Sequence, residues 1–178
     1  MWSSASFTFY LLEFYTKVLP TSSVVTTSVA CGVAEMIGAI TFFLLMRKYD
    51  MKKVLTWTFG FLLLSSTILY LYVIIEDPVE IYSTPQQWVL NLFVFLVRAG
   101  CVVAFTLAYY ITENLTPVSV LATTFSVTNV VSRLVTILAP ISADLMPNPI
   151  ILSAIFANVA FVASFWLDPS HKDQFLDS

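Results

Sequence analysis

The residues most able to do chemistry in this sequence are charged side chains that interrupt long apolar stretches. Glu35, Arg98 and Arg133 each interrupt one stretch, and Glu13 and Lys17 lie four residues apart in another. A charge at the centre of a bilayer costs about 2.5–3.5 kcal/mol even on insertion-based scales. Each of these side chains therefore needs an opposite charge, a polar partner or a water-filled cavity.

Arg133 lies on a polar face of its predicted helix. At three- and four-residue spacing this face carries Ser126, Asn129, Arg133 and Thr136. A guanidinium can bind two carboxylate oxygens at once, so the face suits a small organic anion. An internal ion pair between Arg133 and Glu35, which would only hold the helices together, explains the same residues equally well.

Arg98 lies on a face of mixed character. That face also carries Asn91, Cys101, Phe105 and Tyr109. The mixture can stack against an organic ligand, although aromatic stripes more often pack in a core. If the protein binds a substrate, we expect its ligands among Arg133, Arg98, Glu35, Asn129 and Tyr109.

Two further patterns indicate structural roles. Glu35 lies beside a stripe of small residues spaced by four, Thr26, Ala30, Ala34 and Gly38. Such a stripe lets two membrane helices approach closely. Glu13 and Lys17 can pair at their i, i+4 spacing, or Lys17 can extend to the membrane interface near Pro20.

Other kinds of chemistry find little support. His171 is the only histidine, and Cys31 and Cys101 lie 70 residues apart inside apolar runs. The four glycines form no phosphate-binding loop. We therefore expect no enzymatic activity, no metal site and no cofactor.

The composition indicates an integral membrane protein. Of 178 residues, 58% are apolar, 15% aromatic and 11% charged, and the mean hydropathy is +0.87. A soluble domain carries about 25% charged residues. A net charge of −3 also disfavours nucleic acid as a partner.

Polar, proline-bearing segments divide the chain into six apolar stretches. A crossing needs about 20 residues, so six crossings fit the length. We predict an all-α integral membrane protein, a six-transmembrane-helix bundle occupying residues 1–167 with a polar tail at 168–178. The predicted helices are about 3–18, 22–46, 54–75, 87–111, 118–142 and 150–167.

The basic residues predict the orientation. Arg47, Lys48, Lys52 and Lys53 are half of all Lys and Arg and share one short loop, which should face the cytoplasm or the mitochondrial matrix. The segment 76–87 carries three acidic and no basic residues. With six crossings, both termini lie on the same side as the 47–53 loop. Which membrane holds the protein is left open.

Several motifs in order resemble the carboxy-terminal six helices of a major facilitator superfamily carrier, and most of all the organic anion/organic cation transporter group. They are AEMIGA from residue 34, RKYDMKK from 47, VRAGCVVAF from 97, YYITENLTP from 109, SRLVTILAP from 132 and LDP from 167. The resemblance covers nearly the whole chain. It implies two inverted three-helix repeats and a substrate-facing Arg133 that favours anions.

The sequence also departs from the pattern of that family. The 47–53 loop lacks the family's glycine, and VSVLATTF from residue 118 replaces an arginine and several glycines. Two functions are consistent with these features. One is a non-autonomous structural or assembly subunit of a larger membrane complex. The other is a half-carrier for a small organic ion that works with a second six-helix half. Either would have other membrane subunits and lipids as partners.

Overall fold

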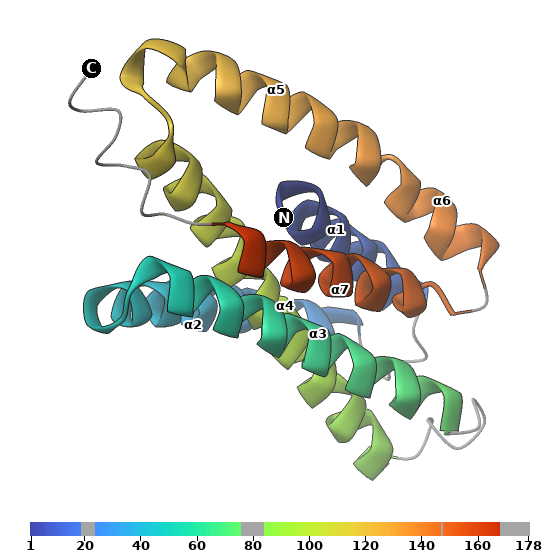
Figure 1. Cartoon of the computed structure of the whole chain (residues 1–178). Helices are drawn as coiled ribbons and strands as arrows, with labels where there is room; N and C mark the ends of the chain where they lie inside the picture. Colours follow the sequence, from blue (N-terminus) through green and yellow to red (C-terminus); the bar gives the residue numbers. More distant parts are fainter. Residues whose placement is uncertain (19–23, 76–83, 147, 168–178) are drawn as a thin grey trace.

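The computed structural model describes residues 1–18, 24–75, 84–146 and 148–167 (Figure 1). Every regular element in these ranges is a helix, which confirms the all-α prediction. The polar tail at 168–178 lies outside the described residues. The helices are α1 (Trp2–Val18), α2 (Val24–Lys48), α3 (Met51–Ile75), α4 (Thr84–Leu115), α5 (Val118–Thr136), α6 (Leu138–Leu145) and α7 (Ile150–Trp166).

α5 and α6 are two parts of one helix interrupted at Ile137. Pro140 has no N–H to donate to the carbonyl of Thr136, and its ring crowds that carbonyl. The backbone N–H of Ile137 still donates to Arg133 O at 3.2 Å, so the chain continues after a local break. Counted in this way the described residues form six helices, and the fifth runs to Leu145 rather than residue 142.

Within the part of the chain that the structure describes, four helices are long and apolar enough to cross a membrane, which indicates a multi-pass membrane protein. These candidate spans are Thr27–Lys48, Met51–Ile75, Trp88–Leu115 and Val118–Leu145. α1 and α7 have 17 residues each, at the lower limit of about 17 for a crossing. Together the six helices are consistent with the predicted bundle.

α1 and α4 are the central helices of the fold. α4 packs on α1, α2 and α3, and α1 packs on α5, α6 and α7 as well. α3 and α7 also pack on each other. In Figure 1 the α5–α6 rod follows one edge of the molecule, with α1 between it and α7.

The side chains of α4 show why it is central. At spacings of three and four, α4 buries Leu90, Val94, Val97, Cys101, Ala104 and Leu107, none more than 1% exposed. The outer helices instead expose large apolar side chains, for example Phe43 at 66%, Leu64 at 60% and Leu134 at 61%. An aqueous surface would disfavour so many exposed apolar groups, whereas lipid accepts them.

Gly38 lets α2 approach α4 closely. A Cβ built on Gly38 would lie 2.8 Å from the Ala99 carbonyl oxygen and 3.1 Å from Val102 Cβ. Only a residue without a side chain fits there without a shift of the backbone. The small-residue stripe ending at Gly38 therefore does mark a close helix contact, and its member Ala34 is fully buried.

Candidate functional site

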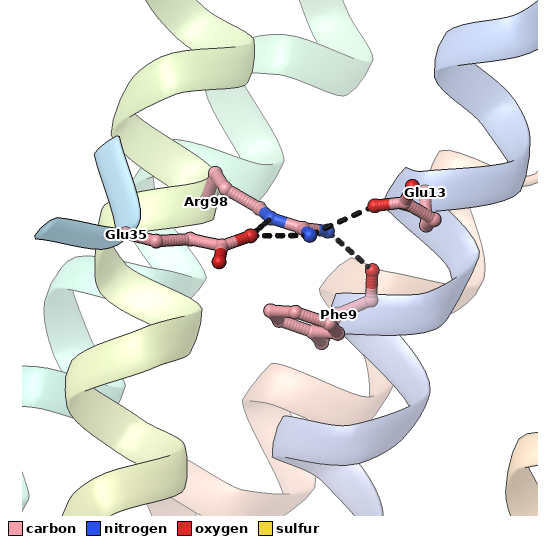
Figure 2. A network of polar contacts seen from close by, with 4 residues as sticks. All are labelled: Phe9, Glu13, Glu35 and Arg98. Atoms are coloured by element: carbon pink, nitrogen blue, oxygen red, sulfur yellow. Dashed lines mark hydrogen bonds and ion pairs between the residues drawn. The ribbon is translucent and has the colours of Figure 1, made fainter. Parts of the chain in front are cut away.

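The described residues hold one buried arginine, Arg98 on α4, and it binds two carboxylates (Figure 2). Its Nε donates to Glu35 Oε1 on α2 at 2.8 Å, and its Nη2 donates to Glu13 Oε2 on α1, also at 2.8 Å. Its Nη1 donates to the backbone carbonyl of Phe9 at 3.0 Å. The arginine thus joins three helices.

The packing around Arg98 explains how a charge is tolerated there. The Arg98 side chain is 5% exposed, while those of Glu13 and Glu35 are 48% and 40% exposed. The guanidinium carbon also lies 3.6 Å from the centre of the Phe9 ring, a cation–π distance. All three guanidinium nitrogens have acceptors within the chain, so the guanidinium is bound internally.

Arg133 has a different environment. It is exposed on α5, and its Nη1 donates to the Tyr10 hydroxyl at 2.7 Å. Beside it lies an open cavity of about 570 Å³. The residues lining this cavity are Tyr109, Asn129, Val130, Arg133, Leu134 and Ile137.

An aromatic cluster forms the wall next to this cavity. The Trp2 and Tyr109 rings lie 4.2 Å apart, and the Tyr109 and Phe125 rings stack at 5.8 Å. Trp2 Nε1 donates to Thr112 Oγ1 at 2.9 Å, which fixes the indole against α4. The cavity therefore combines one accessible cation, an amide and the ring of Tyr109, which packs against Trp2 and Phe125, a set suited to an organic anion.

The structure divides the five predicted ligand residues into two groups. Arg98 and Glu35 meet in the buried network, whereas Arg133, Asn129 and Tyr109 share the open cavity. The alternative ion pair between Arg133 and Glu35 is wrong. Glu35 on α2 binds Arg98 because α2 packs on α4, and Arg133 on α5 donates to Tyr10 because α5 packs mainly on α1.

Two contributors to these sites, Phe9 and Tyr10, escape recognition in the sequence, and a third, Glu13, is recognised without its partner Arg98. Phe9 provides a carbonyl and a ring, and Tyr10 provides a hydroxyl, but neither type stands out in an apolar helix. Glu13 stands out as a charge, yet its nearest basic residue in sequence is Lys17, which suggests the local pair. The Lys17 side chain lies outside the described residues, and Glu13 accepts a hydrogen bond from Arg98.

Within the described ranges, no three His, Cys, Asp or Glu residues gather as a metal site would require. Comparison with protein-family models, curated proteins and solved structures found no match.

Proposed function

We propose that this six-helix unit is a non-autonomous, transporter-like membrane subunit whose main role is structural, within a larger membrane assembly. The observation that carries the proposal is the Arg98 network. Its charges bind one another and join α1, α2 and α4. No catalysis is part of the proposal.

The exposure of α5–α6 supports the proposal that this protein functions only together with other membrane subunits. Only 6% of the most apolar stretch of Val118–Leu145 is buried, and Arg133 is exposed within it. An arginine in hydrocarbon is costly, so in membranes such residues face protein or water. A second membrane subunit, or a further set of helices, would cover this face and surround the arginine.

The contact pattern supports two three-helix repeats. In the first repeat (α1 to α3) and the second (α4 to α7), α1 corresponds to α4, α2 to the α5–α6 rod, and α3 to α7. The packing of α2 on α4 then corresponds to that of α5–α6 on α1, and the packing of α3 on α4 to that of α7 on α1. All of these contacts are present. Three crossings per repeat would invert the second repeat relative to the first, as in transporter folds. We propose on this basis the relation to half of a major facilitator superfamily carrier.

The second candidate function is a half-carrier for a small organic anion. The cavity of about 570 Å³ with Arg133, Asn129 and Tyr109 favours it. In such carriers the substrate lies between two halves, and this cavity is open on the exposed side of α5.

Mild detergent extraction followed by native-gel sizing tests the two candidates. For the structural role we expect a large particle with partners in fixed stoichiometry. We expect Arg98→Ala to lose that particle, while Lys53→Ala, which removes only an exposed pair with Asp50, retains it. A particle no larger than two six-helix halves would contradict the structural role.

Uptake assays on the same cells distinguish the half-carrier function from the structural role. If Arg133→Ala abolishes uptake of an organic anion and leaves the particle intact, the carrier function replaces the structural one. If Arg133→Ala dissociates the particle and no uptake is detected with the unaltered chain, the structural role stands.

A further inference from the structure

An apolar groove of about 400 Å³ lies between α2, α3 and α4, and no residue of either charged site lines it. It exists because small residues line its floor, including Gly38, Ala99 and Gly100, while Trp57 and Phe61 form its sides. The volume is in the range of about 300–1,000 Å³ typical of ligand sites. All three helices are candidate membrane spans, so the groove faces lipid rather than water.

The groove runs toward the basic turn between α2 and α3. Along α2 its wall extends from Ile37 to Leu45, about 12 Å at 1.5 Å per residue. Leu45 is two residues before Arg47, and Trp57 on α3 is four residues after Lys53. The length is close to one leaflet of the hydrocarbon core, about 15 Å.

The end of the groove carries concentrated positive charge. Arg47 and Lys48 lie in the last turn of α2, Lys52 and Lys53 lie in the first turn of α3, and all four are exposed. Lys53 pairs with Asp50 at 2.9 Å. Clusters of basic residues next to membrane helices attract anionic lipid headgroups, by about fivefold in affinity per residue.

Thr58 adds a second indication of a ligand. Its side chain lines the groove and it is 5% exposed. Among the described residues, no hydrogen-bond partner lies within reach of Thr58 Oγ1. The residue is five positions after Lys53, about 7.5 Å further into the membrane. Oγ1 itself lies beneath the groove surface, so the ester carbonyl of a phospholipid, which lies at this depth below its phosphate, accepts this hydrogen bond once the Thr58 side chain rotates toward the groove.

We propose that the groove between α2, α3 and α4 is a binding site for an anionic phospholipid. One acyl chain fills the groove, the ester carbonyl accepts a hydrogen bond from Thr58, and the phosphate lies at Arg47, Lys48 and Lys52. Nothing in this site depends on the structural or carrier role proposed above.

The test uses Trp57 as the reporter. A chain carrying Trp2→Phe, Trp88→Phe and Trp166→Phe retains Trp57 as its only tryptophan. The purified protein is reconstituted in phosphatidylcholine vesicles that contain increasing fractions of phosphatidylglycerol with brominated acyl chains. Brominated phosphatidylcholine at the same fractions is the reference, because bromine quenches only a tryptophan that it touches. We expect brominated phosphatidylglycerol to reach half-maximal quenching at a several-fold lower fraction.

Matched variants assign the effect to the groove. Lys52→Gln should weaken the phosphatidylglycerol preference about fivefold and Lys52→Arg should preserve it. Ala99→Leu, which fills the groove, should remove the preference, whereas Ala39→Leu, exposed on α2 outside the groove, should leave it unchanged. Equal quenching by the two lipids would overturn the proposal, as would a preference that survives both Lys52→Gln and Ala99→Leu.

Discussion

Arg98 on α4 donates two hydrogen bonds, from Nε and from Nη2, to the same oxygen of Glu35 on α2. The pair links residues 63 positions apart in sequence, where α2 packs on α4. Glu13 approaches Nη2 from α1, so the guanidinium lies between two carboxylates (Figure 2). The three residues depend on one another, and removal of any one changes the environment of the others.

Replacing Arg98 with methionine should strongly destabilise the protein, because Glu13 and Glu35 would lose the cation that compensates them. Breaking a buried pair costs about 3–5 kcal/mol, and we expect the lower end because both carboxylates are partly exposed. For a chain of this length that is about 10 °C in the unfolding midpoint. Thermal unfolding in detergent measures it. The exposed Lys53→Met control should shift the midpoint by less than 3 °C, and an equal shift in the two variants would disprove the assignment.

Removing the charges of Arg98, Glu13 and Glu35 together should restore much of the stability that Arg98→Met loses. The variant Arg98→Met with Glu13→Gln and Glu35→Gln removes every charge of the network together. Buried ion networks replaced by neutral groups of similar size are often no less stable. We expect its unfolding midpoint to exceed that of Arg98→Met alone. A triple variant less stable than the single one would show that the carboxylates have other stabilising contacts.

Gly38 and Gly32 provide a matched pair on one helix. Gly38→Ala would place a Cβ 2.8 Å from the Ala99 carbonyl oxygen, so α2 and α4 must separate, at a cost of about 1–3 kcal/mol. A Cβ on Gly32 meets nothing within 4 Å, and Gly32→Ala should gain about 0.5–1 kcal/mol from helix propensity. Unfolding midpoints that move in the same direction would contradict this packing.

Ser132 and Ser6 test how much hydrogen bonds contribute to the attachment of α5. Ser132 Oγ donates to Ser6 Oγ at 2.7 Å, and Ser132 is 2% exposed. Hydrogen bonds between membrane helices average about 0.6 kcal/mol, so Ser132→Ala should lower stability only slightly. Ser132→Leu should instead displace α5 from α1. Limited proteolysis within 113–118 would detect the displacement, and equal cleavage of the two variants would contradict it.

The orientation can be tested with single cysteines introduced at Asp50 and Gln86 in a chain carrying Cys31→Ser and Cys101→Ser. Six crossings predict that a membrane-impermeant thiol reagent reaches the two positions from opposite sides. Sealed vesicles labelled before and after permeabilisation give the answer. Labelling of both positions from the same side would exclude the predicted arrangement.

The helices could be predicted well from the sequence because lipid imposes long apolar runs and prolines mark their ends. Pro149 precedes α7, which begins at Ile150 as predicted. The break at Ile137 was missed since Pro140 acts one turn before its own position. α4 extends beyond its predicted limits at both ends, where polar residues such as Glu113 and Asn114 continue the helix.

The candidate sites were only partly predictable. The cost of burying charge singled out Glu35, Arg98 and Arg133, and the helical spacing grouped Asn129 with Arg133. Pairing across helices depends on which helices are neighbours, and that follows from packing rather than from local spacing. The ion pair between Glu35 and Arg133, one of two alternatives that the sequence leaves open, is therefore the wrong one, and Glu35 binds Arg98. The contributions of Phe9 and Tyr10 follow from the central place of α1, which no pattern in α1 reveals.

The Arg98 network also has a consequence for the order in which the protein is made. Glu13 is synthesised 85 residues before Arg98. At about 5–20 residues per second, the ribosome reaches Arg98 about 4–17 s later. During that interval α1 carries a carboxylate into the insertion machinery without its arginine. α1 is also the helix that later contacts α4, α5, α6 and α7. The hydrogen bond between Glu13 and Arg98 can therefore form only after α4 has been made, so α1 reaches its final packing late in the synthesis of the chain.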